Sequence, residues 1–370
     1  MNHFPAVDPI PLPAPIWLLK ALHLVTLSLH FIAVEMLLGG LLVAAVLSVA
    51  RRGTTASTVT SAIAKRLPVV MTYVINLAVP PLLFAQVLYG RALYTSSVLI
   101  GAWWIGVIGL LMATYWLLYR FAARVESGRS AWWVGLLAWA LAGTVGRVLV
   151  SNMTLMLRPE VWQAMYQSSA AGVNLPTGDV TIFPRWLFMM TGGILFAGLW
   201  LIWLAGSARA TAGERAQLAR VGGWLVAPMA MIQVLAGVGV VFSQPEAIRV
   251  ALDNNWMYLV SREVWLAVMV LCLAAGLFAL IARRSPVAVA WGAAVVALLA
   301  SASMTFYRDG IRDLTLLSKG FDVWNRTVVT NWSVVGLFLV LFVAGLGVIG
   351  WLISVVMRAQ PGPAAKGVEA

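Results

Sequence analysis

Two histidines and a glutamate in one apolar run are the first candidates for chemistry in this sequence. His23 and His30 are two of only three histidines in the chain, and Glu35 follows them closely. In a helix, a spacing of seven residues places both histidines on one face, about 10 Å apart along the axis. Imidazole binds haem iron, and a carboxylate inside a membrane is costly unless it is protonated, paired or next to water. His23, His30 and Glu35 are therefore candidate functional residues.

The histidines limit how a haem could be held. Two histidines on one helix cannot bind the same iron from opposite sides, and no other apolar segment contains a histidine. The single cysteine, Cys272, excludes an intrachain disulfide and covalent attachment of a c-type haem. Any haem would be bound non-covalently, by His and Met, by His and a carboxylate, or by one ligand alone. The structural alternatives are that each histidine hydrogen-bonds a neighbouring helix and that Glu35 pairs with Arg147.

A second group of candidates lies near residue 310 and in the seventh apolar segment. Residues of alternating charge follow the eighth segment, namely Arg308, Asp309, Arg312 and Asp313. They could neutralise one another, or they could hold the anionic groups of a cofactor. Met269 could be an iron ligand, although a methionine is an apolar filler by default.

The composition determines the environment of these residues. Hydrophobic residues make up 62% of the chain and charged residues 10%, whereas soluble domains have about 45–50% and about 25%. Most of the surface must therefore face lipid. The net charge of +12 comes from short basic clusters between apolar segments, which is not the pattern of a nucleic-acid-binding surface.

Apolar segments long enough to cross a bilayer recur along the chain. Spanning takes about 20 apolar residues in a helix, and about nine such segments occur. They lie at 16–50, 67–90, 98–120, 131–157, 184–206, 221–243, 259–282, 286–305 and 332–357. We therefore predict an all-α polytopic membrane protein with an N-terminal segment (1–15), one membrane domain (16–357) and a tail (358–370).

Basic residues predict the orientation of these helices. They cluster in every second connection, for example at Arg51 and Arg52 and then at Arg120 and Arg124. The positive-inside rule places these connections in the cytoplasm. We expect a bacterial cytoplasmic membrane protein with a periplasmic N-terminus and a cytoplasmic C-terminus.

The order of these features resembles subunit I of the cytochrome bd quinol oxidases. The first segment reads Leu22-His-Leu-Val-Thr-Leu-Ser-Leu-His30-Phe-Ile-Ala-Val-Glu-Met-Leu-Leu-Gly39, and it is similar to a family helix in which a His-Phe pair precedes a leucine-rich run. His30 matches the family's first-helix haem ligand. Ser261-Arg-Glu-Val-Trp-Leu-Ala-Val-Met269 lies where the family has its methionine ligand, and Tyr307-Arg-Asp309-Gly-Ile-Arg312 lies where it has Glu-x-Gly-Arg-Gln-Pro-Trp.

The sequence also departs from the family pattern. Pro184-Arg-Trp-Leu-Phe188-Met-Met-Thr-Gly-Gly resembles the fifth family helix, but Phe188 stands in place of a haem-ligating histidine. Phe84 stands in place of an acid, and the quinol-binding loop is reduced to Ser243–Tyr258. These departures weigh against the family's six-coordinate haem and its reduction of oxygen.

The resemblance implies a fold and a function. The fold is a pair of four-helix bundles plus a last helix, and the function is that of a respiratory electron-transfer subunit binding b-type haem, quinol or both, alongside other membrane or cytochrome subunits. The resemblance implies that His30 is the iron ligand and that His23 is a second haem ligand or a propionate partner. Met269 and Asp309 are possible axial ligands, and Arg308 and Arg312 would anchor the propionates. Glu35 would carry protons.

Two other functions remain open from the sequence. Phe188 favours a cofactor-free scaffold with the same fold inside a larger complex. Polar residues in apolar segments favour a carrier with a polar path, formed by Asn76, Gln86, Arg147, Asn152 and Gln233.

Overall fold

The computed structural model describes residues 4–5, 10–50, 53–206, 211–282 and 287–358 of the chain. Its long helices are α1 (Ile16–Leu47), α3 (Leu67–Leu99), α4 (Gly101–Glu126), α5 (Trp132–Leu155), α7 (Ile182–Ala205), α8 (Ala212–Phe242), α10 (Trp256–Ala282), α11 (Val287–Ser318) and α12 (Trp332–Arg358). Short helices are α2 (Thr55–Ala64), η1 (Pro159–Val161), α6 (Trp162–Ser168) and α9 (Glu246–Asp253). The predicted tail beyond Arg358 and the basic pair Arg51 and Arg52 lie outside the described residues.

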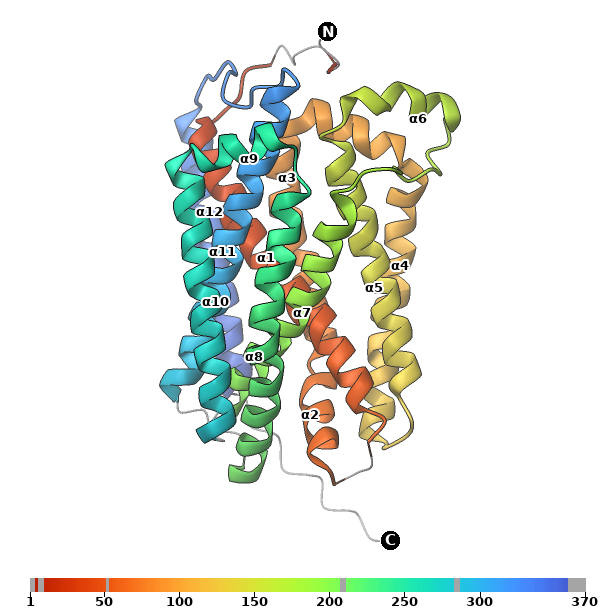
Figure 1. Ribbon diagram of the computed structural model, residues 1–370, viewed down its shortest axis with the longest axis vertical. Helices are drawn as coiled ribbons and strands as arrows, with labels where there is room; N and C mark the ends of the chain where they lie inside the picture. The colour runs from red at the N-terminus through yellow and green to blue at the C-terminus, as the bar shows by residue number, and fades with distance from the viewer. Residues whose placement is uncertain (1–3, 6–9, 51–52, 207–210, 283–286, 359–370) are drawn as a thin grey trace.

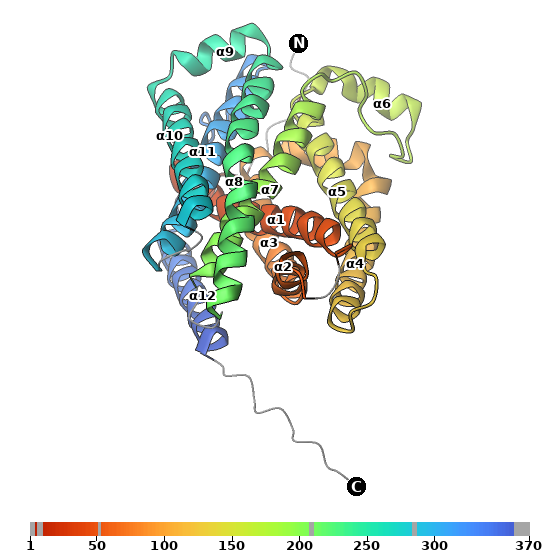
Figure 2. The same ribbon diagram turned by 60° about the horizontal axis from the view of Figure 1, so that its bottom comes forward.

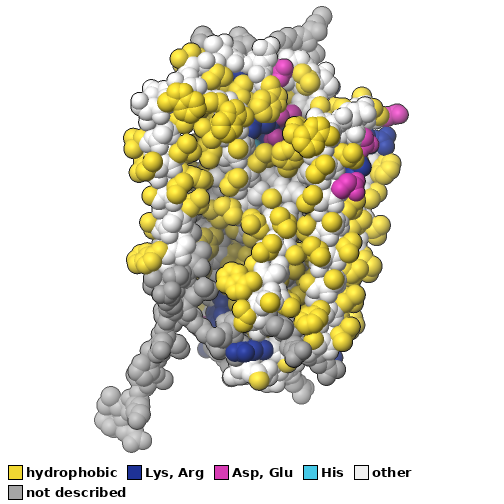
Figure 3. Space-filling model, turned by 90° about the vertical axis from the view of Figure 1, so that its left-hand side faces the viewer, with side chains coloured by type: hydrophobic (Ala, Val, Ile, Leu, Met, Phe, Trp, Pro, Cys, Tyr) yellow, Lys and Arg dark blue, Asp and Glu magenta, His cyan; other side chains and the backbone are white. Residues whose placement is uncertain are grey.

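The protein is an all-α polytopic membrane protein, as the sequence predicts. Within the described ranges, eight helical spans are long and apolar enough to cross a membrane, and they include every long helix except α12. The described apolar part of α12, Trp332–Val348, is shorter and lies where the ninth segment is predicted. On the face shown in Figure 3, hydrophobic side chains cover the sides of the molecule, and the visible charged side chains gather towards its two ends.

Helices α1 and α7 lie between two groups of helices (Figures 1 and 2). α2 to α5 lie on one side, and α8, α10, α11 and α12 on the other. α1 packs against α3, α5, α7 and α11. We call the two ends of the bundle the α6/α9 end, where α1 begins, and the α2 end (Figure 1).

Glycines allow α1 and α7 to cross in backbone contact. A Cβ atom on Gly39 would overlap the carbonyl oxygen of Gly193, and a Cβ atom on Gly193 would lie 2.9 Å from the backbone nitrogen of Gly39. Only glycine fits at such a crossing, as is common where membrane helices approach closely. This contact fixes α7 against the helix that carries His23, His30 and Glu35.

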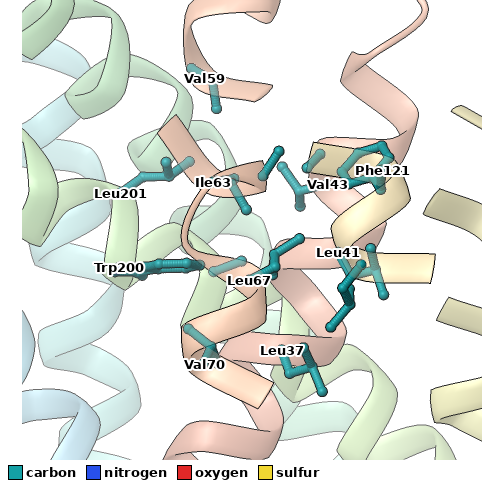
Figure 4. Close-up of a cluster of buried hydrophobic side chains, with 14 of the residues drawn as sticks. Leu37, Leu41, Val43, Val59, Ile63, Leu67, Val70, Phe121, Trp200 and Leu201 are labelled. Carbon is teal, nitrogen blue, oxygen red and sulfur yellow. The ribbon is translucent and has the colours of Figure 1, made fainter. Parts of the chain in front are cut away.

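A hydrophobic core near the α2 end joins α1, α2, α3, α4, α5, α7 and α8 (Figure 4). Leu41 of α1, Ile63 of α2, Leu67 of α3 and Phe121 of α4 are fully buried in it, and Trp200 of α7 is 5% exposed. Close van der Waals packing of these side chains holds α1 against its neighbours at that end.

Three helices extend nine or more residues beyond their predicted bounds. α3 continues to Leu99 and not to 90. α8 begins at Ala212 and not at 221, because Thr211 and Glu214 form a capping box that stabilises an earlier start. α11 continues to Ser318 and not to 305, because its charged residues find partners inside the bundle. Arg308 to Asp313 are therefore helical residues and not part of a connecting loop.

Candidate functional site

A buried ionic cluster near the α6/α9 end joins α1, α3 and α11. The Nζ atom of Lys20 lies 2.5 Å from Oδ2 of Asp309 and 2.5 Å from Oδ2 of Asp313. It also donates a hydrogen bond of 2.7 Å to the hydroxyl of Tyr89, which in turn donates one of 2.8 Å to Asp313. Lys20, Asp309 and Asp313 are each less than 10% exposed. A lysine at this depth is stabilised only by such acidic partners.

Arg312 completes the cluster and contacts His23. Its guanidinium pairs with Asp309 and lies 4.0 Å from the centre of the Tyr89 ring. One of its nitrogens is 3.1 Å from Nε2 of His23, and Nδ1 of His23 is 3.0 Å from the carbonyl oxygen of Pro81. Since a carbonyl oxygen only accepts, we assign the proton to Nδ1, and Nε2 accepts from Arg312. Both ring nitrogens of His23 are therefore engaged.

The cluster balances its own charge. Lys20 and Arg312 supply two cations, and Asp309 and Asp313 supply two anions. The mutual pairing that the sequence left open is thus present. The roles of His23, Asp309 and Arg312 towards a cofactor remain predictions.

Arg308 differs from its neighbours on α11. Its guanidinium lies 5.6 Å from the centre of the Phe31 ring, and it forms no ion pair with a described residue. An unpaired guanidinium inside a membrane protein is a candidate for binding an anionic group. Its predicted role as a propionate anchor stays a prediction.

His30 lies outside the cluster, and only one of its ring nitrogens has a hydrogen-bond partner among the described residues. Its Nδ1 atom is 3.1 Å from the carbonyl oxygen of Val74 on α3, so we assign the proton to Nδ1. Nε2 has no hydrogen-bond partner among the described residues. A metal-bound histidine has this arrangement, with one nitrogen donating to a carbonyl and the other binding the metal.

Glu35 is buried without an ionic partner. Its side chain is 4% exposed, and its Oε2 atom has no hydrogen-bond partner among the residues that the structure describes. The alternative partner Arg147 hydrogen-bonds to Ser151 on its own helix, α5. Among the described residues the predicted pair of Glu35 and Arg147 is therefore not formed.

Gln233 and Gly192 lie beside the Glu35 carboxyl group. A Cβ atom on Gly192 would be 2.9 Å from Nε2 of Gln233 and 3.1 and 3.2 Å from the two carboxyl oxygens of Glu35. Gln233 donates to the carbonyl oxygen of Phe188 at 3.1 Å and accepts from the Thr191 hydroxyl at 2.8 Å. The missing side chain of Gly192 therefore makes room for two polar groups.

A small cavity of about 10 Å³ lies among these residues. Its walls include Glu35, Phe188, Gln233, Trp265, Met269 and Met304. The ring centres of Phe188 and Trp265 are 5.8 Å apart. A volume of about 10–15 Å³ holds one water molecule at most. The space between Phe188 and Met269 therefore does not fit a haem.

The structure separates the predicted site residues into three places. His23, Asp309 and Arg312 meet in the ionic cluster, Glu35 and Met269 line the small cavity, and His30 belongs to neither. The polar residues of the predicted carrier path are not joined by any hydrogen bond among the described residues. Within the described ranges no group of three or more His, Cys, Asp or Glu side chains could hold a metal ion.

Sequence reasoning missed three residues of these sites. Lys20 could have been identified from the sequence, because it is a lysine in an apolar run three residues before His23. No sequence feature near Tyr89 indicates its role, because its hydrogen-bond partners come from α1 and α11. Gly192 matters only through its position beside Glu35.

Comparison with known proteins adds no assignment. No protein-family model matches the chain, and no curated protein matches its sequence. The function must be argued from the residues and the geometry.

Proposed function

We propose that this protein is a membrane subunit of a respiratory electron-transfer complex, similar to cytochrome bd subunit I, that binds a b-type haem through Nε2 of His30. The observation that carries the proposal is the free Nε2 atom beside an Nδ1 atom that bonds the Val74 carbonyl oxygen. This hydrogen bond orients the ring and leaves the metal-binding nitrogen unprotonated. A haem in this position would supply one-electron transfer to and from quinol.

The contacts of the other candidates argue for a single protein ligand. Asp309 is already bonded to Lys20 and Arg312, and Met269 faces a cavity of about 10 Å³. His23 uses both ring nitrogens in hydrogen bonds. Arg308, which has no acidic partner among the described residues, is the better of the two arginines for an anionic group. Glu35 remains the candidate proton carrier.

The same proposal includes the location of the protein. Described basic residues at the α2 end include Lys65, Arg120, Arg124 and Arg215. Basic residues also lie at the α6/α9 end, but Arg158, Arg262 and Lys319 are paired there with acidic residues. The positive-inside rule then makes the α2 end cytoplasmic and the α6/α9 end periplasmic. The partners we propose are quinol and further membrane or cytochrome subunits.

An absorption spectrum tests the haem site. In the detergent-purified protein we expect a reduced-minus-oxidised signal of haem b, with the haem quantified as its pyridine complex. His30→Ala should abolish the signal, because the other described histidine, His23, uses both ring nitrogens in hydrogen bonds and cannot replace the ligand. Met269→Leu is the matched control and should leave the signal unchanged. A colourless, folded protein from haem-replete cells would contradict the proposal.

A cofactor-free scaffold is the second candidate function. The observation that favours it is the closure of the cavity between Phe188 and Met269, where the resemblance implies a haem. Such a subunit would purify colourless and would still co-purify with cytochrome or iron–sulfur partners.

A further inference from the structure

We propose that Glu35, Gln233 and Gly192 form a proton-binding site in which the neutral Glu35 carboxyl group is hydrogen-bonded to one internal water molecule. The site lies between α1, α7, α8, α10 and α11. Its use in proton-coupled electron transfer rests on the proposed function, but its existence does not depend on a bound haem.

The surroundings of Glu35 favour the neutral carboxyl group. Apart from Glu35 itself, none of the residues that line the cavity is ionisable. α7 contributes Phe188, Leu195 and Phe196, α8 contributes Gln233, α10 contributes Trp265 and Met269, and α11 contributes Ala300 and Met304. Described ion pairs do not include Glu35. A carboxylate cannot remain ionised in such surroundings without a cation, whereas a carboxylic acid can.

The unsatisfied oxygen points to a bound water. Buried polar atoms are almost always hydrogen-bonded, and Oε2 of Glu35 has no partner within the described part of the chain. A cavity of about 10 Å³ adjoins it. One water is the ligand of matching size, because a polar cavity of about 10–15 Å³ can hold a single molecule.

Gln233 supplies the second polar wall of the site. Its orientation is fixed, because Nε2 donates to the Phe188 carbonyl oxygen and Oε1 accepts from Thr191. One N–H and one oxygen lone pair remain for a water molecule. Gly192 allows Glu35 and Gln233 to lie close to each other, since a Cβ atom there would come within 3.2 Å of both groups.

The donor set excludes a metal cation as the ligand. Among the side chains that line the cavity, only Glu35 and Gln233 carry oxygen atoms. Calcium takes about six to eight oxygen ligands and magnesium about six in regular geometry. The cavity therefore fits a proton shared between a carboxyl group and water.

Infrared spectroscopy of the purified protein tests the protonated carboxyl group. At neutral pH we expect a carboxylic C=O stretching band that shifts to lower frequency in D₂O and is lost in Glu35→Gln. Glu263→Gln is the matched control, because Glu263 is exposed and paired with Arg262, and it should leave the band unchanged. Absence of an exchangeable carboxylic band in the wild-type protein would overturn the proposal without any variant.

The water is tested separately. We expect a weakly hydrogen-bonded O–H stretching band that shifts in H₂¹⁸O and disappears in Gly192→Ala, whose methyl group would press on both Gln233 and the Glu35 carboxyl group and displace them. Gln233→Leu should remove the band and shift the Glu35 C=O band, which serves if Gly192→Ala does not fold. An unchanged O–H band in a folded Gly192→Ala or Gln233→Leu protein would overturn the water site.

The haem spectrum of the same samples keeps the two proposals apart. A carboxylic band with no haem signal refutes the proposed function and supports the site. A haem signal that depends on His30, with no carboxylic band, refutes the site and supports the proposed function.

Discussion

Lys20 shows what a single buried charge requires in this protein. It is 4% exposed and is bonded to Asp309, Asp313 and Tyr89. These partners replace the water that an ammonium group loses on burial, and each carboxylate is stabilised in the same way. The cluster is therefore a structural unit in which the loss of one member leaves the others without compensation.

Replacement of Lys20 by Met should strongly destabilise the protein. Among the described residues, the variant leaves Asp309 paired with Arg312 alone and Asp313 without an ion-pair partner. Removing one partner of a buried ion pair costs about 3–5 kcal/mol. Thermal unfolding in detergent measures this loss. The control is Lys319→Met, since Lys319 is 38% exposed and 3.4 Å from Glu160, where a pair contributes about 0–1 kcal/mol. Equal stability of the two variants would contradict this account.

The sequence predicts part of the candidate sites, and the reason is physical. His23, His30, Glu35, Asp309 and Arg312 stand out because polar groups in apolar runs are rare. Which of them meet cannot be predicted, because Lys20 and Asp309 are 289 residues apart in sequence. Lys20 also lies near a predicted helix end, where lysine usually reaches the interface. Only the packing of α11 against α1 shows that it is buried.

At the scale of helices, the crossing of α1 and α7 determines the geometry around Glu35. Their backbones touch at Gly39 and Gly193, and this contact places Gly192 beside Glu35. The small cavity thus exists because of how two helices cross. The sequence predicts both helices but not their crossing, because nothing around Gly39 or Gly193 in the sequence indicates which helix each glycine contacts.

Replacement of Gly39 by Ala should force α1 and α7 apart. Overpacking of a close contact costs about 1–3 kcal/mol, and unfolding in detergent measures the loss. Gly109→Ala on α4 is the control, because no atom lies within 4 Å of its Cβ position. That change should be neutral, or stabilising by about 0.5–1 kcal/mol as for alanine in a helix. A Gly39→Ala protein as stable as the control would refute the described crossing.

Helix bounds were predicted less well than helix positions. The hydrophobic pattern places the apolar part of each helix but ignores charged residues that continue it. α8 starts early at a capping box, and α11 runs on through a charged stretch whose partners come from other helices. The capping box can be recognised in the local sequence, whereas the ion pairs of α11 depend on the tertiary structure.

For the whole molecule, composition predicts more than any motif does. A chain with 62% hydrophobic residues must turn apolar side chains outwards, and exposed residues such as Ile105, Leu235 and Leu337 do so. The fold alone does not determine which end of the bundle faces the cytoplasm, so this orientation is tested by experiment.

Cysteine labelling tests the orientation. In a Cys272→Ser background, Gln163→Cys in α6 should react with a membrane-impermeant maleimide added to intact cells. Ser127→Cys, between α4 and α5 at the α2 end, should react only after the cells are opened. Both parent residues are exposed, so accessibility to the reagent is matched. The reverse pattern would invert the proposed topology.

The ionic cluster also has a consequence for biosynthesis. Lys20 leaves the ribosome 289 residues before Asp309, and at about 5–20 residues per second this takes about 15–60 s. Throughout that time α1 carries an ammonium group without its carboxylate partners. The first helix must therefore be held by the insertion machinery or keep Lys20 at the headgroups, and it settles in the bundle only when α11 arrives.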